Sequence, residues 1–194
     1  MHILVTANKG GVGCSTLSFL IATLLPQCLL FTNDLWCVPD ENIVPIKSFD
    51  DVKAYNGLLG SNAVYDISMV RDSELAFSAA KLAKHVLIPC TGNMQSIHAA
   101  IELYKAFRKL KKDAIIVVNG YDNKAHREEL LMLFASRRIL LKDVITFRHS
   151  RLANRILRDG AYWLDHVSCA RGLHRLNRTL EIYRDILRRE LINR

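Results

Sequence analysis

Short apolar runs alternate along the chain with longer stretches in which apolar residues recur every three or four positions. Short runs bounded by polar residues are typical of buried strands, and the periodic stretches are typical of helices. We expect strands at 3–5, 28–32, 63–67, 85–89, 115–119 and 144–147, helices over 15–25, 49–59, 74–84, 94–111, 123–137 and 171–193, and a loop over 35–48. This order predicts an α/β fold with a doubly wound, mostly parallel sheet and helices on both of its faces.

A glycine-rich turn joins the first expected strand to the first expected helix, with the sequence Asn8-Lys9-Gly10-Gly11-Val12-Gly13-Cys14-Ser15-Thr16. Glycines let the backbone approach a phosphate closely, and the free N–H groups at a helix start point toward the anion. Ser15 stands where such loops place the hydroxyl that binds Mg²⁺. The loop usually ends in Gly-Lys-Ser/Thr, but Cys14 occupies the lysine position. We interpret the turn as a phosphate-binding loop without its usual lysine; the alternative is a glycine-rich turn of another parallel-sheet protein.

The composition fits one folded domain over residues 1–194. A length of 194 residues and a hydrophobic fraction of 50% are enough for a full α/β core. The longest apolar stretch, residues 17–31, is interrupted by Pro26-Gln27 and is too short to span a bilayer. No basic region precedes the first apolar residues, so we expect no signal peptide. The 5 cysteines form no Cys-x-x-Cys pair, and reduced thiols in a cytoplasm are the simplest interpretation.

The net charge of +8 is concentrated near the C-terminus. Residues 1–136 contain 13 Lys and Arg against 13 Asp and Glu, whereas residues 137–194 contain 14 against 6. Such asymmetry suggests an anionic partner, either nucleic acid or acidic lipid. A well-solvated basic surface is the alternative.

The glycine-rich turn resembles the deviant Walker A loop of the ParA/MinD family of P-loop NTPases, which reads Lys-Gly-Gly-x-x-Lys-Ser/Thr. Lys9 matches the extra lysine that defines this family. The resemblance continues in Arg71-Asp72-Ser73, which is similar to a segment of small ParA-like proteins of plasmids and other mobile elements, and in the strand His85-Val86-Leu87-Ile88-Pro89. Residues 145–160 resemble the C-terminal pattern of the family, so the resemblance extends over nearly the whole chain.

The resemblance implies a site for ATP or ADP with Mg²⁺. It implies that the loop residues Gly10, Gly11, Val12, Gly13, Cys14, Ser15 and Thr16 hold the phosphates, that Ser15 and Asp66 serve Mg²⁺, and that Asn119 binds adenine. Lys9 would reach the nucleotide of a partner subunit across a homodimer. Asp34 and Asp66, at strand ends, are the candidate catalytic carboxylates besides Lys9. Each of these polar residues also has a purely local alternative, as a cap or a turn residue.

Two departures from the family pattern concern hydrolysis. Cys14 replaces the lysine that places a point charge at the β- and γ-phosphates, and Thr32 stands where the family strand has the first aspartate of Asp-x-Asp. Removing one such electrostatic contact costs roughly 10²–10³ in rate. We therefore expect weak or absent ATPase activity. Alternatively, Cys14 could be a reactive thiol, because a helix N-terminus can lower the pKa of a cysteine.

The last expected helix places leucines on one stripe and arginines beside or opposite it. Packing on the sheet, DNA-phosphate contact and a position on a membrane are three competing interpretations, and we favour packing combined with non-specific DNA contact. The candidate DNA-binding residues are Arg148, Arg151, Arg155, Arg175, Arg178, Arg188 and Arg189. A metal site at His166, Cys169 and His174 is a weaker interpretation, because their spacing matches no standard zinc pattern.

These observations support two hypotheses of function. In the first, the protein is an ATP-dependent dimer that acts in DNA partition, positioning or conjugative transfer with a ParB-like partner. In the second, it is a non-catalytic ParA/MinD-like scaffold or adaptor that positions a pilus or secretion complex. Nucleotide-dependent dimerisation would favour the first, and constitutive dimerisation the second.

Overall fold

The computed structural model describes residues 1–33, 42–54, 62–148 and 185–192. The chain divides into two compact units, Met1–Arg148 and His149–Arg194. The prediction of a single domain over residues 1–194 stays a prediction. The described strands are β1 (His2–Val5), β2 (Cys28–Thr32), β3 (Ile43–Pro45), β4 (Asn62–Asp66), β5 (His85–Thr91), β6 (Asp113–Tyr121) and β7 (Val144–Arg148). The described helices of the first unit are α1 (Cys14–Ala22), α2 (Phe49–Ala54), α3 (Ser73–Leu82), α4 (Met94–Lys109), α5 (Lys124–Ser136) and the 3-10 helix η1 (Leu141–Asp143).

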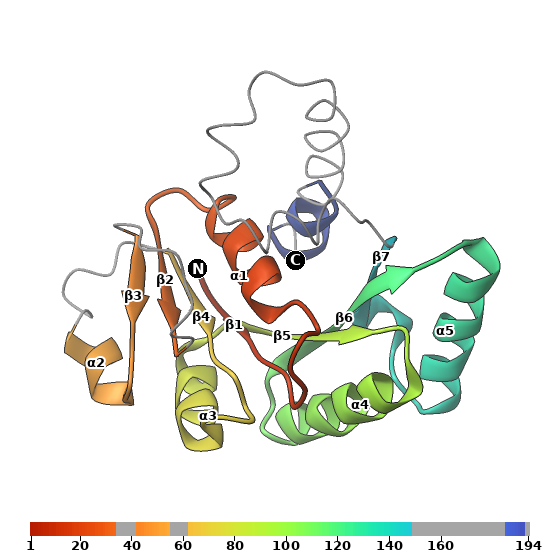
Figure 1. The fold of residues 1–194 in the computed structure, drawn as a ribbon, viewed down its shortest axis with the longest axis horizontal. Coiled ribbons are helices and arrows are strands. Elements are labelled where there is room, and N and C mark those ends of the chain that lie inside the picture. Colours follow the sequence, from red (N-terminus) through yellow and green to blue (C-terminus); the bar gives the residue numbers. More distant parts are fainter. Residues whose placement is uncertain (34–41, 55–61, 149–184, 193–194) are drawn as a thin grey trace. The chain divides into compact units, whose positions relative to one another are not determined.

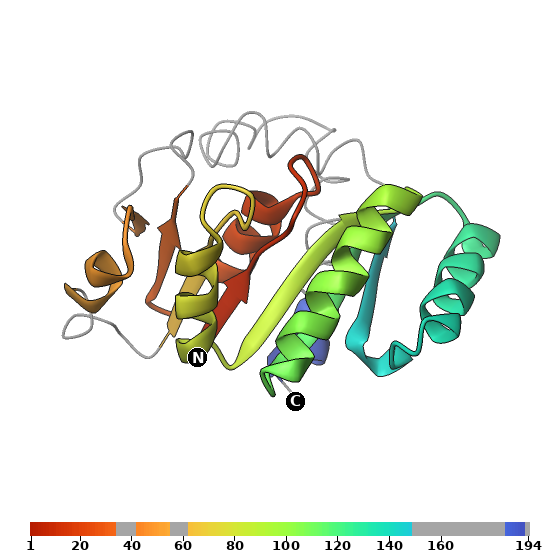
Figure 2. The same cartoon turned by 90° about the horizontal axis from the view of Figure 1, so that it is seen from below.

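The strands of the first unit form one sheet in the order β3-β2-β4-β1-β5-β6-β7, and every neighbouring pair is parallel. The helices lie on both faces of this sheet (Figures 1 and 2), with α3, α4 and α5 in front of it and α1 behind it in Figure 2. The predicted doubly wound α/β fold is therefore confirmed. The chain runs from β1 to β2 on one side of β1 and later from β4 to β5 on its other side. The carboxyl end of β1 therefore lies where the strand order reverses, which is where open α/β sheets bind ligands.

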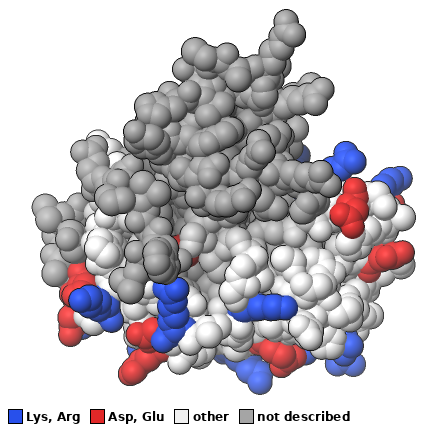
Figure 3. Space-filling view, viewed as in Figure 1, with Lys and Arg blue, Asp and Glu red and all other residues white. Residues whose placement is uncertain are grey.

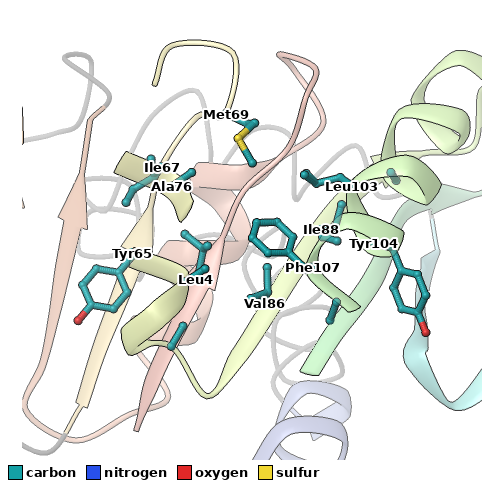
Figure 4. Close-up of a cluster of buried hydrophobic side chains, with 14 of the residues drawn as sticks. Leu4, Tyr65, Ile67, Met69, Ala76, Val86, Ile88, Leu103, Tyr104 and Phe107 are labelled. Carbon is teal, nitrogen blue, oxygen red and sulfur yellow. The ribbon is translucent and has the colours of Figure 1, made fainter. Parts of the chain in front are cut away.

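The hydrophobic core on the α3 and α4 side is built from register-matched strand residues. Leu4 pairs with Tyr65 of β4 and with Val86 of β5, so the three side chains point to one face. Phe107 of α4 is fully buried in the same cluster, as Figure 4 shows. Burying one such large apolar side chain contributes about 1.5–3 kcal/mol. This core fixes the strands whose carboxyl ends carry the polar candidates.

Two elements differ from the sequence prediction. Residues 35–48 were expected to form a loop, yet Ile43–Pro45 is strand β3 at the sheet edge, where a proline is tolerated. Helix α1 was expected to continue to residue 25, but it ends at Ala22. The hydroxyl of Thr23 donates to the carbonyl of Leu20 over 2.8 Å, and such side-chain bonds compete with continued helix.

Two strands extend beyond their expected ends. Strand β5 continues past Pro89 to Thr91, and β6 continues past Asn119 to Tyr121. A proline is accommodated within β5 because the strand still pairs with β6 on both sides of it. The extension of β5 brings Thr91 into register with Asn119 of β6, at the same edge as the glycine-rich loop.

The second unit is described only at residues 185–192, which are helical and end in the π-helix η2 (Arg188–Ile192). Leu187 and Leu191 are buried and Arg188 and Arg189 are exposed, as the apolar stripe predicts for these four residues. The rest of the expected helix over 171–193 lies outside the described residues. Among the described helices, none is long and apolar enough to cross a membrane.

Candidate functional site

The glycine-rich loop connects β1 to α1 and takes a conformation that requires glycine at two positions. Gly11 has a φ of 73° and Gly13 has a φ of 93°, both in the left-handed region that residues with a side chain rarely adopt. Gly13 is also the residue that precedes the first turn of α1. The glycines therefore serve to shape the loop at the start of the helix.

Asn119 packs directly against this loop from the neighbouring part of the sheet edge. Its Nδ2 donates to the carbonyl of Val12 over 2.7 Å. A Cβ at Gly13 would lie 2.6 Å from the same Nδ2, a separation that real Cβ atoms do not reach. The amide of Asn119 thus fixes the loop. The amide oxygen has no partner within the described residues and can accept a further hydrogen bond.

The inner side of the loop offers donors suited to an anion. Within the described residues, the N–H groups of Gly13, Ser15 and Thr16 have no hydrogen-bond acceptor. The hydroxyl of Thr16 is buried and has no partner there either. Gly10 and Gly11 are exposed, and an added Cβ at either would have no described atom within 4 Å. Unpartnered N–H groups and a buried hydroxyl at a helix N-terminus fit the phosphate groups of a nucleotide.

Cys14 begins α1 but does not have the properties of a reactive thiol. Burial raises the pKa of the Cys14 thiol well above its usual range, and the nearby Asp66 carboxylate raises it further. This shift is opposite in direction to the lowered pKa that a thiol activated by a helix N-terminus would have. A neutral thiol occupies the position where related loops carry a charged ammonium group.

Asp66 ends strand β4 beside the ends of β1 and β2. It is the register partner of Val5 on one side and of Thr32 on the other, and it is only 3% exposed. The hydroxyl of Thr32 donates to Oδ2 of Asp66 over 3.4 Å. The carboxylate thus lies at the carboxyl edge near Cys14, in a position suited to a Mg²⁺ ion held through water.

Lys9 is partly exposed and contacts the start of α4 within its own chain. Its Nζ donates to Oε1 of Gln95 over 3.4 Å. Gln95 lies in the first turn of α4, whose N-cap Asn93 accepts from the N–H of Ser96 over 2.9 Å. Sequence reasoning missed Gln95, because a single exposed glutamine carries no motif signal. It is the nearest described hydrogen-bond partner of the lysine.

The structure brings together most of the predicted nucleotide residues. Residues 9–16, Asp66 and Asn119 lie around the β1–α1 connection, at the carboxyl edge of β1, β4 and β6. Of the predicted arginines, Arg148, Arg188 and Arg189 are described, and all three are exposed. Asp34, Arg151, Arg155, Arg175 and Arg178 lie outside the described residues, as do His166, Cys169 and His174. No group of three His, Cys, Asp or Glu side chains within the described part could hold a metal ion.

No protein-family model matches the chain, and no curated protein matches it. Among solved structures it is similar to apo McdA from Cyanothece, with a TM-score of 0.65 and 12% identity over 96% of this chain and 98% of that one. It is also similar to a proposed plasmid partition protein from Borrelia burgdorferi bound to AMPPNP, with a TM-score of 0.57 and 17% identity over 94% and 97%. A third similar structure is MinD from Pyrococcus horikoshii complexed with Mg-ADP, with a TM-score of 0.60 and 13% identity over 94% and 95%. The chain therefore has the ParA/MinD-like fold of P-loop proteins.

Proposed function

We propose that this protein is a ParA/MinD-like nucleotide-binding protein that takes ATP or ADP with Mg²⁺ at the β1–α1 loop. The observation that carries the proposal is the loop itself, with Gly11 and Gly13 at positive φ and N–H groups that have no acceptor among the described residues. Thr16 supports the proposal, because its buried hydroxyl has no hydrogen-bond partner among the described residues and a bound ligand could supply one. The similar structures bound to AMPPNP and Mg-ADP have the same fold.

Each part of the nucleotide has a candidate partner in this chain. The N–H groups of residues 13–16 would hold the phosphates, and Ser15 and Asp66 would hold Mg²⁺, which neutralises phosphate charge. Asn119 would accept from or donate to the adenine edge while its Nδ2 keeps the loop in place. Titrating ATP and ADP in the presence of Mg²⁺ tests this assignment; the absence of binding to either would contradict it.

We infer that hydrolysis of ATP is weak or absent. A neutral Cys14 supplies no charge to the β- and γ-phosphates, and Thr32 supplies a hydroxyl where the family has a carboxylate. Replacing one charged group at such a site lowers the rate by roughly 10²–10³. Phosphate release measured for the wild type and for Cys14→Lys tests this inference. Equal and rapid turnover in both proteins would overturn it.

Dimerisation through Lys9 would couple nucleotide binding to assembly. In the described structure Lys9 contacts Gln95 of its own chain, a weak exposed contact that the lysine can exchange for a phosphate of a partner's nucleotide. Light scattering after size-exclusion chromatography, with and without ATP·Mg²⁺, measures this directly. We expect a dimer that depends on nucleotide and is lost in Lys9→Ala but kept in Lys124→Ala, which removes an exposed lysine elsewhere.

Non-specific DNA is the proposed anionic partner of the C-terminal region. Arg148, Arg188 and Arg189 are exposed, and the whole excess positive charge of the chain lies within residues 137–194. Phosphate contacts of this kind weaken steeply as salt concentration rises. DNA binding that falls with salt, and that weakens in Arg188→Ala/Arg189→Ala, is the expected result. Salt-independent binding or none would remove DNA as the partner.

A non-catalytic scaffold is the second candidate, and the environment of Cys14 favours it. A half-buried neutral thiol near Asp66 and the Thr32–Asp66 hydrogen bond describe a site in which uncharged side chains stand at two charged positions of the family pattern. Such a protein would act as a cytoplasmic adaptor for a pilus, secretion or ParB-like partner. A dimer that forms without nucleotide, and does not change on adding ATP·Mg²⁺, would support this candidate over the first.

A further inference from the structure

The edge of the sheet opposite the glycine-rich loop carries an unusual concentration of cations. In Figure 2 the ends of α3 and α4 and the α5–β7 connection follow the lower margin, while the loop between β1 and α1 (red) is at the top. The three segments 81–84, 108–113 and 137–143 form this edge, and they contain nine Lys and Arg against two Asp. We call this surface the basic edge.

Side-chain contacts hold the three segments together. Nζ of Lys112 donates to the carbonyl of Lys81 over 3.0 Å, which joins the ends of α3 and α4. The hydroxyl of Tyr104 donates to Oδ2 of Asp143 over 2.7 Å, which joins α4 to η1. The basic edge is therefore one continuous surface of the first unit.

The two aspartates of the basic edge are already engaged. Asp143 is 1% exposed and accepts from Tyr104, and Asp113 pairs with His85 at 2.6 Å and with Arg108 at 3.7 Å. Six exposed cations, by contrast, have no side-chain partner within the described residues: Lys81, Lys84, Lys109, Lys111, Arg137 and Arg138. On the face seen in Figure 3, Lys and Arg are interspersed with Asp and Glu instead.

Two of these cations stand where the backbone favours glycine. Lys111 has a φ of 58° and Arg138 has a φ of 62°, each just beyond the end of a helix. In both cases the next residue closes the helix, as Lys112 N–H donates to Phe107 O and Ile139 N–H to Phe134 O, each at 3.0 Å. Glycine is the usual residue at this position of the motif. The helix dipole explains cations in a last turn, but not the choice of a strained basic residue over glycine.

Leucines alternate with the cations along the basic edge. Leu82, Leu110, Leu140 and Leu141 are 38%, 55%, 50% and 49% exposed, and each directly adjoins or lies within two residues of an exposed Lys or Arg. A surface of this composition has both charge for anionic headgroups and apolar side chains for the acyl boundary. We propose that the basic edge docks the protein on the surface of an anionic membrane.

Lipid is favoured over nucleic acid as the occupant because of the leucines. The phosphates of a nucleic acid can pair with the cations, but its backbone offers no apolar environment for the leucines. The three segments also contain no aromatic residue that could stack on a base. Peripheral docking needs no spanning helix. The inference does not depend on nucleotide binding, since the basic edge and the β1–α1 loop lie at opposite ends of the strands.

Sedimentation of the full-length protein with phosphatidylcholine vesicles, with and without phosphatidylglycerol, tests the proposal. We expect binding only to the vesicles that contain phosphatidylglycerol. Lys111→Gly/Arg138→Gly should lower the partition coefficient roughly 25-fold. Lys105→Gln/Lys124→Gln, which removes the same charge from other surfaces, should lower it far less. Because glycine suits positions 111 and 138, the edge variant remains folded, which thermal unfolding verifies.

A second pair of variants separates the apolar contribution from the charge. Leu110→Gln/Leu141→Gln should lower vesicle binding about tenfold at unchanged net charge. Val70→Gln/Met132→Gln, which changes two exposed apolar residues outside the basic edge, should leave binding unchanged. Three results would overturn the proposal: equal binding to neutral vesicles, vesicle binding unaffected by the edge variants, or loss of DNA binding in the cation variant with no effect of the leucine variant on vesicles.

Discussion

The hydroxyl of Thr32 donates a hydrogen bond to the carboxylate of Asp66 over 3.4 Å, and both side chains are buried at the ends of paired strands. In the ParA/MinD family pattern an aspartate stands where this chain has Thr32. A second carboxylate here would face Asp66, and two buried carboxylates without a cation repel each other. Thr32 avoids this repulsion, but it lacks the carboxylate that the pattern associates with hydrolysis.

Thr32→Asp should therefore make folding depend on Mg²⁺. At pH 7 without magnesium, we expect the variant to lose about 2–4 kcal/mol of unfolding free energy, because an unpaired charge becomes buried. Millimolar Mg²⁺ should restore a large part of this loss. Thr32→Val is the control, with a loss of about 1 kcal/mol for one hydrogen bond and no response to Mg²⁺. Urea unfolding with and without Mg²⁺ measures the unfolding free energies of both variants. If Mg²⁺ does not stabilise Thr32→Asp, this result contradicts a metal position beside Asp66.

Two glycines of the loop should respond differently to alanine. Gly13→Ala combines a φ of 93° with a Cβ 2.6 Å from Asn119 Nδ2, so we expect it to cost about 2 kcal/mol or more of stability. Gly10→Ala has nothing within 4 Å of the new Cβ and should change stability by less than about 0.5 kcal/mol. Denaturant midpoints compare the two variants, and similar values would show that Asn119 does not hold the loop as described.

The sequence predicted the alternation of strands and helices and the glycine-rich loop because both have strong local signals. Apolar runs such as 115–119 mark buried strands, and the closely spaced glycines mark the turn between β1 and α1. Strand β3 was missed because its three residues include Pro45 and lie at a sheet edge, where pairing with β2 rather than apolar pattern defines the strand. A strand that is defined by such pairing shows no alternation of apolar and polar residues in the sequence.

The site shows the same limit. The family resemblance implied that Asn119 contacts the nucleotide, but its bond to Val12 spans 107 positions and depends on how β6 passes the loop. The Lys9–Gln95 contact and the raised pKa of Cys14 beside Asp66 arise likewise from packing between distant elements. The sequence motifs identified these residues as candidates, whereas their contact partners could be identified only in the folded structure.

Stability should fall at alkaline pH because several thiols are buried. Burial raises the pKa of Cys28 to about 11 and of Cys90 to about 12, and it raises that of Cys14 further. Above a pH of about 8.5 the unfolded chain releases these protons while the folded chain keeps them, so the unfolding free energy declines by about 1.4 kcal/mol per pH unit for each thiol. Urea unfolding from pH 7 to pH 10 measures the decline. Cys90→Ala should reduce its slope by one thiol's share, and an unchanged slope would contradict the burial of Cys90.

The left-handed residues at the helix ends should store strain that glycine releases. Lys111→Gly and Arg138→Gly are each expected to raise the unfolding free energy by about 0.5–1 kcal/mol. Lys109→Gly, within the last turn of α4, should instead lower it by a similar amount, because glycine is unfavourable inside a helix. Thermal unfolding distinguishes the two directions. Destabilisation by all three substitutions would show that positions 111 and 138 carry no such strain.

Isothermal titration calorimetry with ATP·Mg²⁺ tests the central claim, that the β1–α1 loop binds a nucleotide without the usual lysine. Wild type should bind one nucleotide per chain, and Cys14→Lys should bind it about tenfold more tightly because the ammonium group adds a charge-assisted hydrogen bond to phosphate. Lys9→Ala should weaken binding mainly by preventing dimerisation. If neither ATP nor ADP binds the folded wild type at millimolar concentration while Cys14→Lys also fails to bind, the loop is not a nucleotide site.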